Sequence, residues 1–210
     1  MSLNLTRFSR PDCGALFVVT GASGTGKTTL VKEALATVPD LSFSVSATTR
    51  APRVGEVSGR DYHFVSQDRF SEMVEEGAFL EWAEVYGNRY GTPRAPVETA
   101  LQHGESILLE IDAEGAAQVR ESMQEAVFIF ILPPSIETIE KRLRGRSTDS
   151  EEIITRRLAD ARLQLSRCGD FEYLLVNDDL HSGFDQLQAI LVAELLRVGR
   201  RSSLVAQFRW

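Results

Sequence analysis

The sequence predicts an α/β fold in which a parallel β-sheet is flanked by helices. Short apolar runs of strand length alternate with amphipathic segments of helix length, and that order is typical of parallel strands joined by helical crossovers. A glycine-rich turn separates the first apolar run from the first amphipathic segment. The chain has 210 residues, of which 43% are hydrophobic, so it is long enough to bury a substantial core.

The strands are predicted at apolar runs that turn residues bound on both sides. These runs are 15–20, 43–47, 107–112, 127–132 and 173–177. The helices are predicted where apolar residues recur at spacings of three and four. These segments are 26–37, 113–123, 135–144, 151–167 and 184–198.

Two stretches interrupt the alternation. Residues 48–92 are rich in Gly, Pro, aromatic and charged residues and contain short strand-like pieces, so they are predicted to form an inserted subdomain. Residues 141–167 combine a short arginine-bearing segment with the helix that follows it, and are predicted to form a lid. The remaining segments, 1–47, 93–140 and 168–210, are assigned to the core.

The glycine-rich turn, GASGTGKT from Gly21 to Thr28, matches the phosphate-loop pattern between a strand and a helix. Backbone N–H groups of such a loop and the N-terminus of the helix favour a bound anion, while Lys27 would hold the β- and γ-phosphates and the Thr28 hydroxyl would ligate Mg²⁺. The predicted ATP-binding residues of the loop are Gly21, Ala22, Ser23, Gly24, Thr25, Gly26, Lys27, Thr28 and Thr29. This loop predicts a core of the P-loop NTPase type, but the match does not distinguish a kinase from a GTPase or an ATPase.

Composition excludes several other classes of protein. A formal net charge of −7 argues against non-specific binding to nucleic acid, which needs a basic face. No apolar run approaches the length of a membrane span, and Cys13 and Cys168 lack the spacing of a zinc site or a disulfide framework. We therefore expect a cytoplasmic protein with small-molecule partners, with no nucleic acid and no membrane.

The inserted subdomain carries the most specific signal. Residues 44–65 read SVSATTRAPRVGEVSGRDYHFV, and they are followed by FLEW at 79–82 and YGTP at 90–93. In these motifs, and in their order from Gly21 to Asp178, the chain closely resembles the guanylate kinase family. The resemblance implies an enzyme that transfers a phosphoryl group from ATP to GMP and makes GDP, in purine nucleotide metabolism. It also makes 48–92 a GMP-binding subdomain.

The resemblance implies that Arg50, Arg53, Tyr62 and Tyr90 bind the phosphate of GMP. Two guanidinium groups and two phenol hydroxyls suit a dianion. Arginines in a loop are often only solvated charges, but here they lie in a TTRAPR segment of an acidic chain.

The resemblance also implies a set of residues that read guanine. Glu81 matches a carboxylate that accepts from N1–H and the N2 amine, a pattern that adenine cannot supply. Ser46 and Thr92 match hydroxyls that donate to guanine O6, and Asp112 matches a residue that contacts the base. Glu110, where the family often has aspartate, is placed near the hydration shell of Mg²⁺, through water, or near the GMP sugar.

The lid resembles the family's arginine-bearing lid. Arg142, Arg146 and Arg157 match arginines that close over the ATP phosphates, so they are assigned to catalysis together with Lys27. Asn177, at the end of the last predicted strand, matches an ATP contact on the adenine side.

Two other functions remain open from the sequence. A guanylate-kinase-like module that binds peptides would keep the fold, but such modules typically lose the phosphate loop, which is intact here. Another kinase of the same fold that acts on a phosphorylated sugar would share the loop but lack the acceptor residues. The sequence leaves open whether the chain forms a homo-oligomer, and it assigns no role to the tail 197–210.

Overall fold

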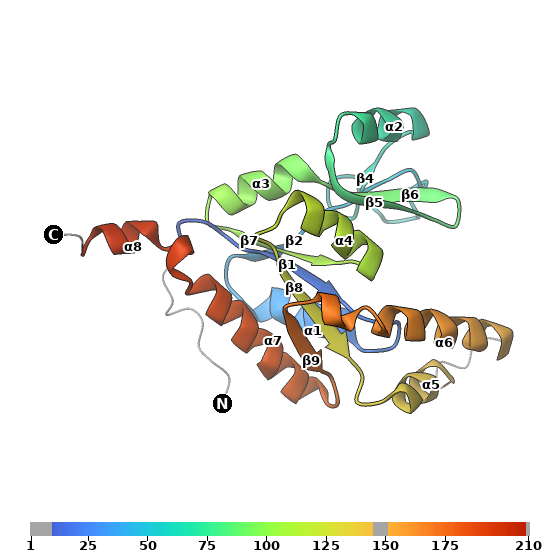
Figure 1. Cartoon of the computed structure of the whole chain (residues 1–210). Coiled ribbons are helices and arrows are strands. Elements are labelled where there is room, and N and C mark those ends of the chain that lie inside the picture. Colours follow the sequence, from blue (N-terminus) through green and yellow to red (C-terminus); the bar gives the residue numbers. More distant parts are fainter. Residues whose placement is uncertain (1–9, 145–150, 209–210) are drawn as a thin grey trace.

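A computed structural model of the chain describes residues 10–144 and 151–208. Its core is a parallel sheet with the strand order β2-β7-β1-β8-β9 and helices on both faces (Figure 1), which confirms the predicted fold class. The strands of this sheet are β1 (Leu16–Thr20), β2 (Leu41–Phe43), β7 (Ser106–Glu110), β8 (Val127–Leu132) and β9 (Tyr173–Val176).

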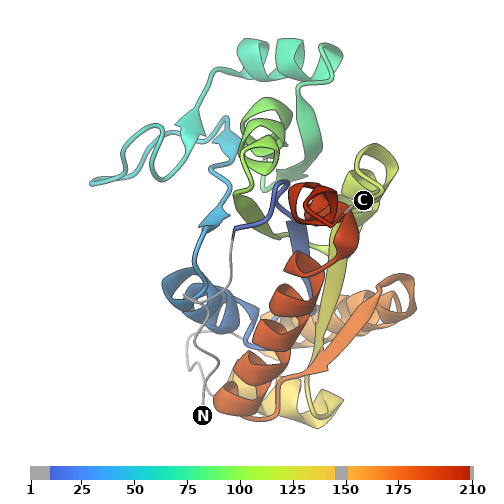
Figure 2. The same cartoon turned by 90° about the vertical axis from the view of Figure 1, so that its left-hand side faces the viewer.

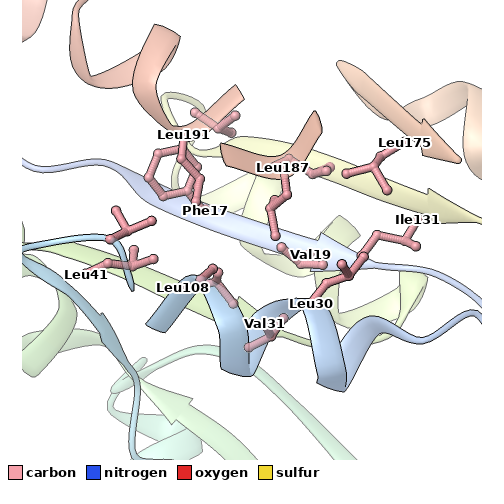
Figure 3. Packing of buried hydrophobic residues seen from close by; sticks show 14 of the residues in the cluster. Phe17, Val19, Leu30, Val31, Leu41, Leu108, Ile131, Leu175, Leu187 and Leu191 are labelled. Carbon is pink, nitrogen blue, oxygen red and sulfur yellow. The ribbon is translucent and has the colours of Figure 1, made fainter. Parts of the chain in front are cut away.

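The central strand β1 is buried along its whole length because it lies between β7 and β8. Successive side chains of a strand point to opposite faces, so β1 contributes to two clusters. Phe17 and Val19 pack with α1 (Lys27–Thr37) and α7 (Leu180–Leu195), as Figure 3 shows. The alternate residues pack with α3 (Arg94–Gln102) and α4 (Ala113–Ser122). Each fully buried large side chain contributes about 1.5–3 kcal/mol to the free energy of unfolding. The two clusters therefore hold in place the carboxyl end of β1, where the phosphate loop begins.

A second, smaller sheet with the order β4-β3-β6-β5 lies beside the core, with α2 (Gln67–Glu75) packed on it (Figures 1 and 2). Its strands are β3 (Ala47–Thr48), β4 (His63–Phe64), β5 (Phe79–Val85) and β6 (Asn88–Pro93). Phe70 of α2 is fully buried and stacks on Phe79 of β5 with ring centroids 4.6 Å apart.

The predicted lid, 141–167, covers the end of α5 (Ile136–Arg144) and all of α6 (Glu151–Leu165). Ile139 of α5 and Ala161 of α6 are buried together with Ala22 of the phosphate loop. Helices α5 and α6 therefore share a small apolar cluster with the loop. Residues 145–150 lie outside the described residues, and the predicted catalytic arginine Arg146 is among them.

One predicted strand is wrong. Residues 43–47 were expected to form a core strand, but β2 ends at Phe43 and β3 begins at Ala47 in the other sheet. The alternation of apolar and polar residues in 43–47 is compatible with a strand of either sheet. The local sequence therefore does not show that this segment is divided between the two sheets. The sequence also did not predict α2 and α3, nor the start of α7 at Leu180, where the Asp179 carboxylate accepts from the backbone N–H of Ser182 at 2.9 Å.

The tail packs back on the beginning of the described chain. The backbone N–H of Asp12 donates to Arg200 O at 2.9 Å, and its carboxylate accepts from the backbone N–H of Ser203 at 2.7 Å. The tail segment comprises the short helices η3 (Val198–Arg200) and α8 (Ser202–Ala206).

In residues 10–144 and 151–208, no helix combines the length and apolar character needed to cross a bilayer.

Candidate active site

The phosphate loop joins β1 to α1, as predicted. Gly26 precedes the first residue of α1 with a φ of 89°, a left-handed conformation that glycine adopts without strain. A Cβ at Gly26 would lie 2.4 Å from the side-chain nitrogen of Asn177, so the loop also needs glycine for space. The turn thus leads directly into the helix N-terminus, where an anion is stabilised.

Lys27 lies along the loop. Its ammonium group donates to the carbonyl oxygens of Gly21 at 2.5 Å and Ala22 at 3.2 Å. Burial lowers the pKa of Lys27, while the nearby carboxylates of Glu110 and Asp112 act in the opposite direction. The ammonium is therefore a partly desolvated cation, in a setting where its attraction for a phosphate is strong.

Two buried polar side chains fix the shape of the loop. The Thr25 hydroxyl donates to Ala22 O at 2.9 Å, and the Asn177 side-chain amide donates to Thr25 O at 2.7 Å. Asn177 is 5% exposed and is wedged between the loop and α7, since a Cβ at Gly183 would lie 2.6 Å from its side-chain oxygen. Its side-chain amide thus contacts the loop backbone, and this support was not part of the sequence-based assignment.

Oxygen ligands suited to a magnesium ion lie at the start of α1. The Thr28 hydroxyl donates to Glu110 Oε1 at 2.7 Å, which joins the helix to the end of β7. A hydroxyl and a carboxylate are ligands of the hard kind that Mg²⁺ accepts, directly or through water. The residues present therefore fit the metal expected from the sequence.

A cavity of about 360 Å³ lies between the core and the smaller sheet. It brings together predicted acceptor residues from segments far apart in the chain. Those that line it are Ser46, Tyr62, Glu81, Tyr90, Glu110 and Asp112. Glu110 also contacts Thr28 of the phosphate-loop helix, so the cavity and the loop adjoin one another.

Glu81 is the buried carboxylate of this cavity, with 8% of its surface exposed. A β-bulge between Phe79 and Glu81 sets the register so that Glu81 pairs with Thr92, whose hydroxyl donates to Glu81 Oε1 at 2.5 Å. Burial raises the pKa of the Glu81 carboxyl above its ordinary value; the hydrogen bond from Thr92 acts against this shift and the charge of Asp112 adds to it. Thr92 thus contacts the predicted guanine reader itself.

Three of the predicted phosphate-binding residues meet at the rim. The Arg50 guanidinium lies 5.3 Å from the ring centroid of Tyr62, and the rings of Tyr62 and Tyr90 meet edge to face with centroids 6.1 Å apart. Arg53 is exposed in the adjoining turn. The first partner of Arg50 is Glu56, whose two carboxylate oxygens accept from one guanidinium nitrogen at 2.9 and 3.1 Å.

The sequence patterns did not predict a role for Glu56. Its carboxylate also accepts from the backbone N–H of Arg53 at 2.7 Å, so it fixes the turn that carries both arginines. The hydrogen bond with Arg50 is the main cause that lowers the pKa of the Glu56 carboxyl. An acidic residue three positions after the second arginine of a basic turn is the signal that could have identified it. Arg60 and Asp61 also line the cavity and were not predicted.

Asp112 lies where α4 begins. Its carboxylate accepts from the backbone N–H groups of Glu114 at 3.1 Å and Gly115 at 2.8 Å, so it caps the helix. One side chain, two residues after the end of β7, therefore both starts the helix and lines the cavity.

The lid arginines are placed differently from one another. Arg142 of α5 approaches the carbonyl oxygens of Gly24 at 3.2 Å and of Asn177 and Asp178 at 3.5 Å, and so lies beside the phosphate loop. Arg157 is half-buried on α6.

The chain is similar to known proteins over most of its length. The sequence model of a family described as "Guanylate kinase" matches residues 14–194. The guanylate kinase of Carboxydothermus hydrogenoformans is 49% identical over 187 residues, which cover 89% of this chain and 92% of that protein. The guanylate kinase of Parasynechococcus marenigrum is 54% identical over 178 residues, which cover 85% and 98%. The crystal structure of guanylate kinase from Anaplasma phagocytophilum superposes with a TM-score of 0.72 at 34% identity and covers 94% of each chain.

Proposed function

We propose which residues bind each substrate in this chain, which belongs to the guanylate kinase family and phosphorylates GMP to GDP with ATP. Its fold is that of a nucleoside-monophosphate kinase, and its substrates are ATP and GMP. In our proposal ATP occupies the phosphate loop and GMP occupies the cavity of about 360 Å³ beside Glu81.

The observation that carries the acceptor assignment is the buried carboxylate of Glu81. It is 8% exposed, accepts from Thr92 and faces the cavity, so its remaining acceptor capacity is directed at a ligand. Guanine offers N1–H and an amine side by side, whereas adenine opposes a carboxylate with a lone pair. A buried carboxylate therefore discriminates between the purines through the cost of an unpaired polar group.

The GMP phosphate would be bound by Arg50, Arg53, Tyr62 and Tyr90 at the rim. This assignment is supported by the approach of Arg50 to Tyr62 and Tyr90. Ser46 and Asp112, which also line the cavity, would complete the contacts to the base.

On the donor side, loop N–H groups and Lys27 would hold the ATP phosphates. Arg142 lies against the loop, and with Arg146 and Arg157 it would stabilise the charge that develops during transfer. Kinases of this family use a divalent metal ion; bound as Mg²⁺ by Thr28, with Glu110 through water, it would neutralise the phosphate charges. Asn177 would contribute on the adenine side and through its hydrogen bond to the loop.

The chemistry requires no general base on the protein. The second pKa of a phosphate monoester is about 6, so GMP is largely a dianion at neutral pH and its phosphate oxygen is already nucleophilic. The protein contributes positioning and electrostatic stabilisation, and closure of the lid would exclude the water that would hydrolyse ATP.

The remaining sequence predictions accompany this proposal. The division into a core (1–47, 93–140 and 168–210), a GMP-binding insertion (48–92) and a lid (141–167) is part of it. So are a cytoplasmic location and the absence of nucleic-acid and membrane partners.

The test is the variant Glu81→Gln. The amide presents an NH₂ group toward the purine in place of one acceptor, so we expect the ratio of kcat/KM for GMP to that for AMP to fall by about 100-fold. The KM for ATP should stay unchanged, because Glu81 faces the other substrate. Unaltered purine discrimination would refute the assignment.

A further inference from the structure

Helix α4 is joined to strand β5 by side-chain hydrogen bonds that the mechanism above does not use. The Trp82 backbone N–H donates to Gln118 Oε1 at 3.0 Å, and Gln118 Nε2 donates to Trp82 O at 3.1 Å. One turn further along the helix, the Ser122 hydroxyl approaches Leu80 O at 3.4 Å. We call these contacts of Gln118 and Ser122 the α4–β5 seam.

The seam follows from the position of β5 at the edge of the smaller sheet. Strand β5 pairs with β6 on one side, with Trp82 opposite Gly91, and its other side faces α4. A glutamine amide carries a donor and an acceptor in the spacing of a backbone peptide, so Gln118 takes the place of a neighbouring strand.

The two elements that the seam joins carry the two acidic residues proposed to meet guanine. Glu81 immediately precedes Trp82, and Asp112 caps the first turn of α4. Gly115 separates them: a Cβ there would lie 3.2 Å from Glu81 Oε2 and 3.5 Å from Asp112 Oδ1. Sliding or tilting of β5 against α4 would therefore alter the separation of the two carboxylates.

We propose that Gln118 is a positioning residue for guanine recognition, which fixes the Glu81 carboxylate relative to Asp112 by pairing with both backbone groups of Trp82. The inference rests on the proposed function, since it assigns Gln118 to the site that Glu81 defines. The smaller sheet is thereby joined to the core at β5, the guanine-reading strand that carries Glu81. The turn that carries Arg50 and Arg53 lies at the opposite edge of that sheet, next to β4.

The principal experiment is Gln118→Leu, which retains a side chain of similar length but loses both hydrogen bonds. We expect the KM for GMP to rise about 10-fold and the GMP to AMP selectivity to fall by a similar factor, with kcat and the KM for ATP within about twofold of the wild type. A side chain that only stabilised the fold would lower the thermal midpoint and the amount of active enzyme without changing selectivity.

Three further variants complete the design. Gln118→Glu keeps the acceptor for the Trp82 N–H and loses the donor, so its KM for GMP should lie between the wild type and Gln118→Leu. Ser122→Ala should have the smaller effect, because its bond is longer. The matched control is Gln186→Leu on α7, which removes an amide that bonds the backbone of another strand at Val176 O, 3.4 Å away, and should change neither GMP parameter.

The proposal is overturned if Gln118→Leu and Gln118→Glu both keep the wild-type KM for GMP and selectivity, or if Gln186→Leu changes them equally. Glu81→Gln, measured alongside, separates this outcome from failure of the proposed function. If Glu81→Gln loses selectivity while both Gln118 variants keep it, the positioning role alone is wrong. If Glu81→Gln also keeps it, the assignment of the guanine site is wrong and the positioning role fails with it.

Discussion

The donor loop and the acceptor cavity are built in different ways. The loop is held by short-range backbone geometry and by buried side chains such as Thr25 and Asn177, which contact its carbonyl oxygens. The acceptor cavity is assembled from distant segments, with a desolvated carboxylate at Glu81 and an ion pair between Arg50 and Glu56 at its rim. The difference indicates that the donor loop takes its shape from the core, whereas the shape of the acceptor cavity depends on charged side chains and therefore varies with pH and salt.

The strongest test of the separation is Lys27→Ala. We expect kcat/KM to fall by about 1,000-fold, because the variant removes a partly desolvated cation from the transferred phosphates. Binding of GMP, measured by calorimetry, should change little, since the acceptor cavity is built from other segments. Lys32→Ala, on the exposed side of the same helix, is the control. A Lys27→Ala enzyme that lost GMP binding as well would show that the two sides are coupled.

The next largest effect should be a rise in the KM for GMP when the pH is lowered. Burial raises the pKa of Glu81, so this carboxyl gains its proton at a higher pH than an exposed glutamate and then opposes guanine N1–H with a donor. The KM for GMP should rise about tenfold for each pH unit below that pKa. Glu81→Gln should lack this component and retain only the titration of the GMP phosphate itself. A pH profile of KM that is the same in both enzymes would contradict the role of the carboxylate.

The same shift has a consequence for stability. Because the pKa of folded Glu81 exceeds its unfolded value, the favourable contribution is present below the unfolded pKa and is lost as the pH rises through the folded pKa. At neutral pH the charged, buried form therefore destabilises the fold. Glu81→Gln, which is permanently neutral, should unfold at a higher temperature than the wild type at pH 7, and the difference should shrink toward acid pH.

A smaller effect is expected from Asn177→Ala on the donor side. Loss of the buried hydrogen bond to Thr25 O should cost about 1–3 kcal/mol, which lowers the unfolding midpoint by about 2–4 °C per kcal/mol. The KM for ATP should rise about 10-fold, because the loop loses its support. Asn88→Ala, at the start of β6, is the control. A variant that bound ATP normally would show that the loop keeps its shape unaided.

The smallest effect should follow from Glu56→Gln. The Arg50–Glu56 pair has side-chain exposures of 15% and 20%, and Glu56 also fixes the turn at Arg53. We expect a rise of about threefold in the KM for GMP and a weaker dependence of that KM on salt. Glu72→Gln removes a more exposed pair, with Arg69 on α2, and should change neither quantity. Equal salt dependence in Glu56→Gln and the wild type would show that the pair does not organise the phosphate site.

The sequence predicted the core because its evidence is local. Apolar runs of strand length specified β1, β7, β8 and β9, and the glycines of the loop require a backbone that few other residues adopt. The prediction from sequence failed at 43–47, where a single stretch of alternating apolar and polar residues is divided between two sheets. It also failed at α2, whose N-cap residue Ser66 lies inside a polar stretch. Propensity identifies an element, but the sheet that an element joins is set by partners far away in the chain.

The sequence by itself determined the phosphate loop, the family and the chemical types present in the acceptor site, because each of these is carried by contiguous residues. Only the tertiary structure revealed that a bulge aims Glu81 at Thr92, that Glu56 fixes the arginine turn, and that Gln118 joins the guanine-reading strand to α4. Thr92 and Gln118 are reached across 11 and 36 residues, so these pairings depend on the register of β5 with β6 and on the packing of α4 against β5. Glu56 contacts Arg50 and Arg53 within one turn, and the conformation of that turn brings these side-chain and backbone groups within hydrogen-bond reach.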